Sequence, residues 1–179
     1  MQIIIDDHLY LREIKLADAD AVFSLIDQNR DTFRVWLPFV DYTREVTDTV
    51  NFIQSVINKN EDEKDFVFVM IFQQEIVGLI GFRGTDYTNR KTEIGYWIGS
   101  HAEGKGIVTR ATKAAIDFAF NNLDMNRIII RHAVENTRSG KIPERLGFLF
   151  EGMERDGEKV NDVFYDLKVH SLLKREWQK

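Results

Sequence analysis

The sequence predicts a domain of the α+β class, with a mixed sheet that contains hairpins and at least one parallel crossover. Three observations lead to this prediction. Short apolar runs separated by turns precede residue 83, as in hairpins. From residue 92 a strand, a glycine loop, a long helical pattern and another strand follow one another, as in a parallel crossover. The 179 residues hold two prolines, no Gly/Ser-rich linker and no internal repeat, so a single domain over residues 1–179 is the simplest organisation.

The first half of the chain contains three strand-like and two helical patterns, besides an irregular aromatic segment. Residues 9–14 are expected to form a strand, and Asp18 is expected to cap the helix that follows. A second helix is expected over residues 47–60, and residues 66–72 and 76–82 are expected to pair as a hairpin. The helical residues expected to face the core are Ala21, Val22, Leu25, Ile26, Val50, Ile53 and Ile57.

The second half carries the more specific pattern. In chain order we expect a strand at residues 92–98, a glycine loop at 99–106, a helix from Ile107, a strand at 127–134, a short helix at 136–146 and two further strands, the last at 164–172. Gly147 is expected to stop the short helix. Within that helix Pro143 removes the hydrogen bond to the carbonyl of Ser139. We expect a kink there, and the alternative is a carbonyl left free for a ligand.

The loop before the long helix has the chemistry of a phosphate site. Gly104 and Gly106 allow backbone N–H groups to converge on one point, and the helix that starts after them adds unpaired donors and a partial positive charge. Such a place suits a diphosphate, with Lys105 and Arg110 as further cations. The loop lacks the Lys-Ser/Thr of a P-loop and the third glycine of the dinucleotide fingerprint. An ordinary tight turn between strand and helix is the alternative.

This loop resembles the acyl-CoA signature Gln/Arg-x-x-Gly-x-Gly/Ala of the GNAT N-acetyltransferase superfamily. Gly104 and Gly106 match the signature, whereas His101 stands where Gln or Arg is usual. Other segments resemble the branch of ribosomal-protein N-terminal acetyltransferases called RimJ/RimL. These segments are Leu11-Arg12, residues 18–20, 36–38 and 93–98, Asn126-Arg127, residues 136–139 and 144–148, and Glu151-Gly152. The resemblance implies a mostly antiparallel central sheet that splays between two parallel strands, with flanking helices.

The resemblance also implies acetyl-CoA as the coenzyme and a set of residues around it. The pantetheine arm is expected to bond to the backbone around residues 96–99, in the gap between the strands. Arg138 and Lys141 are expected near the nucleotide end. The implied coenzyme-binding residues are Tyr96, Trp97, Ile98, Gly99, His101, Gly104, Lys105, Gly106, Ile107, Val108, Thr109, Asn136 and Ser139.

The reaction moves an acyl group from a thioester to a neutral amine. An α-amine has a pKa of about 7.7–8.0 and needs only a mild base, whereas a lysine at about 10.4 needs a stronger one. We expect Ser139 to donate at the sulfur and Glu93 to be the base, with Glu158 as the alternative base. A backbone N–H near Ile98 is the expected oxyanion donor. A capping hydroxyl for Ser139 and a solvated Glu93 are the non-catalytic alternatives.

The acceptor is the least determined part of the prediction. The first hypothesis is a protein N-terminus, in particular of a ribosomal protein, and the second is a small amine such as a polyamine, aminoglycoside or amino acid. A regulatory module that binds CoA without turnover is a third, and an unrelated nucleotide-binding domain a fourth. An aromatic cluster is expected either to wall the acceptor groove or to lie in the core: Phe33, Trp36, Phe39 and Tyr42. Relatives are often dimers, and a homodimer is compatible with the sequence.

The composition excludes other classes. Apolar residues make up 44% and charged residues 30% of the chain, which is typical of soluble globular domains. With 29 acidic and 24 basic residues the net charge is −5, which argues against a nucleic-acid-binding protein. There is no cysteine, and His101 and His132 have no partner at ligand spacing, so no metal site is predicted. No apolar run reaches membrane length and the start lacks the basic flank of a secretory signal, so we expect a cytoplasmic protein with no membrane segment.

Overall fold

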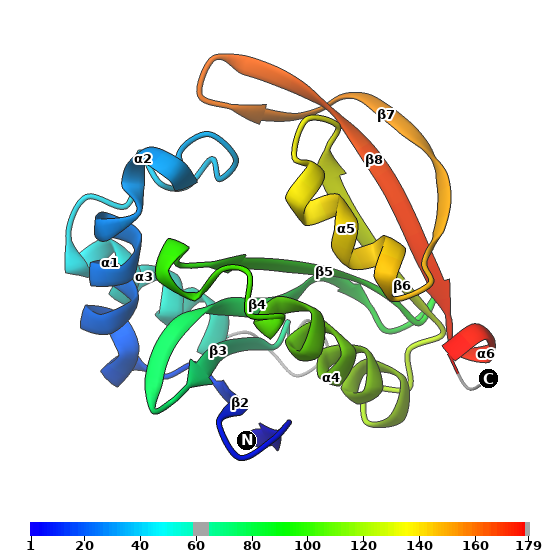
Figure 1. The fold of residues 1–179 in the computed structure, drawn as a ribbon, viewed down its shortest axis with the longest axis horizontal. Coiled ribbons are helices and arrows are strands. Elements are labelled where there is room, and N and C mark those ends of the chain that lie inside the picture. The colour runs from blue at the N-terminus through cyan, green and yellow to red at the C-terminus, as the bar shows by residue number, and fades with distance from the viewer. Residues whose placement is uncertain (59–64, 178–179) are drawn as a thin grey trace.

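An eight-stranded mixed sheet runs through the part of the chain that the computed structural model describes, residues 1–58 and 65–177 (Figure 1). The strands lie in the order β1-β2-β3-β4-β5-β6-β8-β7. Their bounds are β1 Gln2–Ile4, β2 Leu9–Glu13, β3 Val67–Phe72, β4 Glu75–Asp86, β5 Lys91–Ile98, β6 Arg127–Ala133, β7 Leu149–Val160 and β8 Val163–Leu173. The helices are η1 Leu16–Asp18, α1 Ala19–Gln28, α2 Arg30–Phe33, α3 Val46–Ile57, η3 Ser100–Ala102, α4 Ile107–Asn121, α5 Thr137–Arg145 and α6 Lys174–Trp177.

The two faces of the sheet carry different helices. Along β3, Phe68 and Met70 belong to the core cluster that contains the buried face of α4, whereas Val69 and Ile71 belong to the cluster that contains α1 and α3. Because successive side chains of a strand point to opposite faces, α4 covers one face and α1 with α3 covers the other. In the first of these clusters the ring centres of Phe82 and Phe118 lie 6.2 Å apart. Both faces of the central strands are therefore buried, which explains their continuous apolar sequence.

Most of the predicted elements are confirmed, including the hairpin of β3 and β4 and the order of the second half. Strand β1 was not predicted, although it pairs antiparallel with β2 over Gln2–Ile4. The helical prediction at residues 47–60 extends beyond the described residues, and α3 ends at Ile57. Within residues 1–58 and 65–177, no helix is both long and apolar enough to cross a membrane.

The sequence prediction was wrong in three details of α1 and α3, the two helices expected in the first half of the chain. Ala21 is exposed and Ala19 is buried instead, because the buried face of α1 consists of Ala19, Val22, Leu25 and Ile26, and Ala21 lies outside it. Ile57 is 41% exposed and is the last residue of α3. Asp18 precedes α1 but makes no side-chain cap to it.

The carboxylate of Asp18 instead accepts hydrogen bonds from the preceding strand and turn. This carboxylate accepts from the two terminal nitrogens of the Arg12 guanidinium, at 2.9 and 2.7 Å, and from the backbone N–H of Lys15 at 2.9 Å. This charge-assisted bidentate pair is stronger than a neutral cap, so it decides where the carboxylate points. The pair holds the start of α1 against β2.

The crossover through α4 is parallel, and it leaves a gap in the sheet. Strands β5 and β6 pair only at Lys91–Arg127, Thr92–Ile128 and Glu93–Ile129. Beyond these pairs β5 continues to Ile98 on β4, while β6 continues on β8. The splayed sheet that the resemblance implied is therefore confirmed. Among the described residues, the edge of β5 from residue 94 onward has no strand partner on the β6 side.

Strands β7 and β8 form a long hairpin that bends over the front of the gap (Figure 1). Two register shifts, between Phe150 and Gly152 and between Glu154 and Glu158, allow the bend. At the tip, the Asn161 side chain donates to the backbone carbonyl of Arg34 at 3.0 Å. This contact ties the hairpin to the segment after α2, so that the two enclose the region above β5.

Candidate functional site

The loop between β5 and α4 forms a cradle of backbone groups. Gly104 and Gly106 have φ of +75° and +69°, a conformation that glycine adopts at little cost. Gly106 is the N-cap of α4, and the first N–H groups of that helix have no partner within it. These amides and the helix dipole together favour an anion.

The cradle is open where a bound phosphate would lie. An ideal Cβ built on Gly104 or Gly106 meets no protein atom within 4 Å, although both glycines line the main cavity. A side chain at either position would therefore fill cavity space beside the amides, and glycine keeps that space free. The residues present fit a diphosphate.

The cavity beside the cradle has a volume of about 570 Å³, within the range of small-molecule sites. It extends from Gly104 past Tyr96 and Ile98 on β5, reaches Ser139 at the start of α5, and ends at Phe33 of α2. Of the thirteen residues that the resemblance implied for coenzyme binding, all line this cavity except Gly99, His101 and Lys105. One space thus connects the loop, the gap in the sheet and the aromatic segment.

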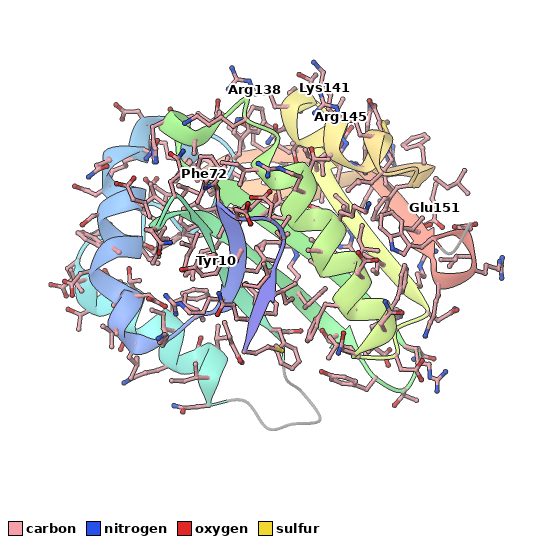
Figure 2. All side chains as sticks on the ribbon, turned by 60° about the horizontal axis from the view of Figure 1, so that its bottom comes forward. Tyr10, Phe72, Arg138, Lys141, Arg145 and Glu151 are labelled. Carbon is pink, nitrogen blue, oxygen red and sulfur yellow. The ribbon has the colours of Figure 1, made fainter. Side chains whose placement is uncertain are left out.

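The three residues that do not line the cavity have other surroundings. His101 lies in η3 with its ring folded over Gly99, 2.9 Å from where a Cβ of that glycine would be. The ammonium of Lys105 lies 5.7 Å from the ring centre of Phe72 (labelled in Figure 2), and Arg110 forms an ion pair with Asp6. The cradle consists of backbone donors, with these side chains outside it.

The first turn of α5 crosses the gap and is fastened to β5. The side chain of Asn136 accepts from the backbone N–H of Ser139 at 3.1 Å and so caps the helix. The hydroxyl of Tyr96 donates to the backbone carbonyl of Ser139 at 3.0 Å, and the Ser139 hydroxyl lies 3.3 Å from the Tyr96 oxygen. Burial raises the pKa of Tyr96 well above its usual range, so the phenol stays protonated. Asn136 therefore caps α5, and the Ser139 carbonyl has a partner that was not predicted.

One face of α5 presents cations to the cavity. Arg138, Lys141 and Arg145 follow one another at helical spacing and all line it, and Figure 2 shows them along α5 at the top of the view. Arg138 forms an ion pair with Glu103 of the loop before α4, across the mouth of the cavity. Arg138 and Lys141 were expected here from the sequence, whereas Arg145 was not. The spacing of three and four residues between them was the available signal.

Neither of the two candidate bases lines the cavity; Glu93 lies on β5 where that strand still pairs with β6, and Glu158 lies on β7. The carboxylate of Glu93 is buried and accepts from the Nε of Arg83 at 2.8 Å, and it is paired with Arg131 at 3.4 Å. Within residues 1–58 and 65–177, Glu158 on β7 has no such direct ion pair. Burial raises the pKa of Glu158, and the charge of Glu93 raises it further, while Arg83 and Arg131 oppose the shift. The two carboxylates thus have different environments.

The far wall of the cavity is aromatic and comes from the segment after α1. Phe33 packs edge-on against Trp97, with ring centres 5.2 Å apart, and Trp36 lies 5.8 Å from Tyr165 of β8. Phe33 and Trp36 line the cavity, while Phe39 contacts Trp97 from outside. The prediction for Tyr42 was wrong in both of its forms, because its side chain is 77% exposed and neither lines the cavity nor belongs to the core.

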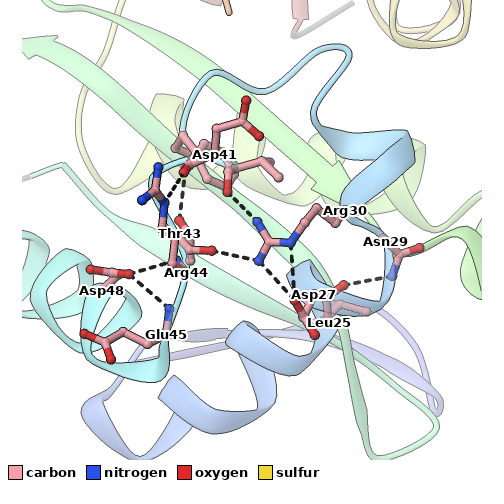
Figure 3. A network of polar contacts seen from close by, with 11 residues as sticks. Leu25, Asp27, Asn29, Arg30, Asp41, Thr43, Arg44, Glu45 and Asp48 are labelled. Carbon is pink, nitrogen blue, oxygen red and sulfur yellow. Dashed lines mark hydrogen bonds and ion pairs between the residues drawn. The ribbon is translucent and has the colours of Figure 1, made fainter.

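A polar network holds this aromatic segment in place (Figure 3). The guanidinium of Arg30 donates to the backbone carbonyls of Val40 and Thr43, at 2.7 and 2.8 Å, and to the carboxylate of Asp27 at 3.0 Å. Further along, Asp48 accepts from the backbone N–H of Arg44 at 2.8 Å. Because the segment has little regular structure, these charged contacts decide how its aromatic side chains are presented.

Asn29 links the end of α1 to the cradle loop, and the sequence analysis missed it. Its side-chain oxygen accepts from the backbone N–H and the hydroxyl of Ser100, at 2.9 and 2.6 Å. Its amide donates to the carbonyl of Leu25 at 2.8 Å (Figure 3). Nothing in the local sequence distinguishes this asparagine from one that merely ends a helix.

Comparison with known proteins bears on what this cavity does. Residues 8–149 match the family described as "Acetyltransferase (GNAT) domain". The chain is 38% identical to "Putative ribosomal N-acetyltransferase YdaF" of Bacillus subtilis (strain 168), over 97% of this chain and 96% of that protein. It is 24% identical to the "Ribosomal-protein-serine acetyltransferase" of Escherichia coli (strain K12), over 94% of each.

A solved structure is similar in both sequence and shape. It is that of the microcin C7 self-immunity acetyltransferase MccE in complex with acetyl-CoA and AMP. The identity is 29%, the TM-score is 0.89, and the match covers 94% of each chain.

Proposed function

Because the chain belongs to the acetyltransferase (GNAT) domain family and is an acetyl-CoA-dependent N-acetyltransferase, we propose that it acetylates the N-terminal α-amine of a protein, in particular a ribosomal protein. The observation that carries the proposal is the continuity of the cavity. It joins the glycine cradle to the aromatic wall and passes Ser139 where β5 and β6 separate. A donor and an acceptor that enter from opposite ends would meet beside Ser139.

The coenzyme supplies an activated acetyl group as a thioester. The backbone amides from Gly104 to Thr109 bind its diphosphate, and the cations of α5 attract the nucleotide end. The unpaired edge of β5 around Trp97 and Ile98 bonds to the amides of the pantetheine arm as another strand would. A backbone N–H near Ile98 donates to the acetyl oxygen as that oxygen gains charge.

Ser139 is the proton or hydrogen-bond donor at the sulfur. Its hydroxyl lies at the wall of the cavity in the first turn of α5, and Asn136 fixes its backbone. The carbonyl of the same residue is held by Tyr96. The hydroxyl keeps its freedom to rotate from Tyr96 toward the sulfur, because its bond to the phenol oxygen is long at 3.3 Å.

Of the two candidate bases, we favour Glu158 over Glu93, although Glu93 is the first candidate from the sequence. The carboxylate of Glu93 is held by Arg83 and Arg131, and both contacts favour its charged form and oppose proton uptake. The pKa of Glu158 is raised by burial, which brings a carboxylate closer to the neutral pH at which it must accept a proton. Glu158 does not line the cavity, so a water molecule would carry the proton from the amine to it.

An α-amine suits this arrangement better than a lysine. At neutral pH an α-amine with a pKa of about 7.7–8.0 is already neutral in a sizeable fraction, whereas a lysine at about 10.4 is almost wholly charged. A carboxylate acting through water is a mild base, so it is sufficient only for the first. The names of the relatives YdaF and ribosomal-protein-serine acetyltransferase support a ribosomal acceptor.

A small molecule is the second candidate acceptor. The solved structure of the acetyltransferase MccE, at 29% identity, is a complex with acetyl-CoA and the small molecule AMP. The aromatic end of the cavity, with Phe33 and Trp36, would stack equally well on a planar ligand. The family and the names of the relatives favour an enzyme over a CoA-binding module without turnover.

A panel of acceptors separates these candidates. Peptides that copy the N-termini of ribosomal proteins and contain an internal lysine are incubated with acetyl-CoA, and mass spectrometry locates the acetyl group. We expect acetylation of the α-amine only, and none on the same peptides with a blocked N-terminus. The proposal is wrong if polyamines, aminoglycosides, amino acids or nucleotide amines release CoA thiol faster than every peptide.

A further inference from the structure

The backbone carbonyl of Ser139 lacks its usual partner within α5. In an α-helix this carbonyl accepts from the N–H four residues later, which would be that of residue 143. Pro143 has no N–H, and it lies in the interior of α5. The helix therefore leaves this carbonyl, in the wall of the cavity, to be satisfied from outside.

Tyr96 supplies the missing donor from another element. Its hydroxyl donates to the Ser139 carbonyl at 3.0 Å, across the gap between β5 and α5. A hydroxyl has one proton, so the Tyr96 oxygen is then an acceptor for the Ser139 hydroxyl, 3.3 Å away. The phenol thus holds the backbone of Ser139 with its proton, while its oxygen is a distant acceptor that leaves the Ser139 hydroxyl able to turn toward the sulfur.

We propose that Tyr96 is a positioning residue for acetyl transfer, and that Pro143 gives it this role by leaving the Ser139 carbonyl to the phenol. Ser139 is then fixed at its N–H by Asn136 and at its carbonyl by Tyr96, while its hydroxyl, 3.3 Å from the phenol oxygen, can turn toward the sulfur. The proline serves this contact, whereas the sequence predicted only a kink or a carbonyl open to a ligand. The inference rests on the proposed role of Ser139 at the sulfur.

The test uses Tyr96→Phe, Pro143→Ala and the double variant, with Tyr10→Phe as the control. Tyr96→Phe keeps the ring and removes only the hydroxyl. Pro143→Ala restores an N–H that reaches the Ser139 carbonyl from within the helix. Tyr10 lies on β2 and does not line the cavity. Turnover is followed with whichever amine the unmodified protein acetylates fastest, so the result does not depend on a protein being the acceptor.

A second readout needs no turnover. Ser139-Gly140 is the only Ser-Gly step in the sequence, so carbonyl-13C serine with 15N-glycine gives a single NMR correlation that reports this carbonyl. Loss of a hydrogen bond at the carbonyl lowers its 13C shift. Thermal unfolding of all variants shows whether a change in turnover merely follows a loss of folding.

We expect Tyr96→Phe to lower kcat by roughly 5- to 20-fold, the worth of one or two hydrogen bonds, with KM for acetyl-CoA changed by less than about threefold. The Ser139 carbonyl shift should fall, and the double variant should recover most of that shift and part of kcat. Pro143→Ala alone should keep kcat within about threefold, because the carbonyl oxygen accepts two bonds. Tyr10→Phe should change neither readout.

Two results would overturn the inference. One is a Tyr96→Phe variant with unchanged kcat while Ser139→Ala is slow, which refutes the positioning role and leaves the role of Ser139 intact. The other is a loss of kcat in Tyr96→Phe that the double variant does not relieve and that leaves the carbonyl shift unmoved, which is the behaviour of a packing residue. Full turnover by Ser139→Ala refutes both assignments together.

Discussion

Asn29 holds Ser100 by two hydrogen bonds to a single side-chain oxygen, and through them the end of α1 is joined to the start of the cradle loop. Residue 29 is 9% exposed, so water does not replace the contact when it is lost. The cradle is therefore supported from a helix on the opposite face of the sheet from α4. This support has a measurable consequence.

Asn29→Leu should weaken both folding and coenzyme binding. The substitution leaves the N–H and hydroxyl of Ser100 without their acceptor, which costs about 1–3 kcal/mol of unfolding free energy. The loop should then be less well ordered, and the Kd for CoA should rise several-fold. Denaturant titration and calorimetry measure the two effects. A variant with lower stability and unchanged CoA affinity would show that Asn29 supports the fold alone.

Gly104→Ala and Gly106→Ala should each reduce CoA affinity by tenfold or more. The added methyl occupies the space beside the amides, and a left-handed backbone costs an alanine roughly 1–2 kcal/mol. Gly84→Ala is the matched control, because Gly84 has φ of +59°, open space around its Cβ position and no part in the cavity. All three should lose similar stability, and only the first two should lose affinity. If all three variants bind CoA with equal affinity, the diphosphate is bound at another place.

Glu158→Gln should lower kcat/KM by about two orders of magnitude, the usual effect of removing a general base. Since the base works deprotonated and burial raises the pKa of Glu158, kcat/KM of the unmodified protein should fall with acid at a pH above the ordinary range of a glutamate. Glu93→Gln should mainly lower stability, by about 1 kcal/mol, because it removes the counter-charge of Arg83 and Arg131. If the fall of kcat/KM at acid pH disappears in Glu93→Gln and remains in Glu158→Gln, the base is Glu93 and not Glu158.

Arg145→Ala should weaken binding of CoA more than that of dephospho-CoA. Arg145 shares the cavity face of α5 with Arg138 and Lys141, so it adds to the charge that attracts the phosphates at the nucleotide end. We expect a three- to tenfold rise in Kd for CoA at low salt and a smaller one at high salt, since salt screens exposed charges. Lys113→Ala, on the exposed side of α4, is the control. Equal effects on both ligands would exclude a contact with the additional phosphate.

A buried pair of histidines should make the fold sensitive to acid. His132 and His170 stack with ring centres 5.3 Å apart beneath α5, and each has a ring nitrogen without a hydrogen bond among the described residues. Burial lowers the pKa of both; the charge of Lys168 lowers them further and that of Glu144 raises them. Below a pH of about 6.5 the unfolded chain therefore binds more protons than the folded one, and stability falls as the pH falls.

His170→Phe removes one titrating ring from this pair. The dependence of unfolding free energy on pH should become flatter below about pH 6.5, as measured by denaturant titration at a series of pH values. His8→Gln, at an exposed position, should leave the slope as it is. An unchanged slope in His170→Phe would mean that other groups cause the acid sensitivity.

The elements that follow from local signals were predictable. The strand, glycine loop and helix from residue 91 to 121 depend on neighbours in sequence, on positive φ at Gly104 and Gly106 and on helical spacing, and the structure has them where predicted. The end of the short helix at Gly147 also follows from a local signal, a glycine with positive φ. The parallel crossover followed from the order of these elements, because strands joined through a helix return in the same direction.

The remaining parts depend on contacts between distant segments. The carboxylate of Glu93 pairs with Arg83 and Arg131, which lie on the two neighbouring strands. No pattern in the sequence indicates these two pairs. The same holds for Asn29 with Ser100 and for Tyr96 with Ser139, pairs that are 71 and 43 residues apart. The helical pattern also did not indicate the exposure of Ile57, the last residue of α3. Sequence patterns identified the residue types, and the topology decided their partners.

The central claim is that the coenzyme and the acceptor meet at Ser139, with the diphosphate on the amides of residues 104–109. A crystal structure of the protein with CoA and an N-terminal peptide of a ribosomal protein tests it most directly. The account predicts phosphate oxygens within hydrogen-bond distance of those amides, the sulfur beside the Ser139 hydroxyl, and the peptide α-amine approaching from the side of Phe33 and Trp36. A coenzyme bound away from Gly104 and Gly106, or a sulfur remote from Ser139, would contradict it.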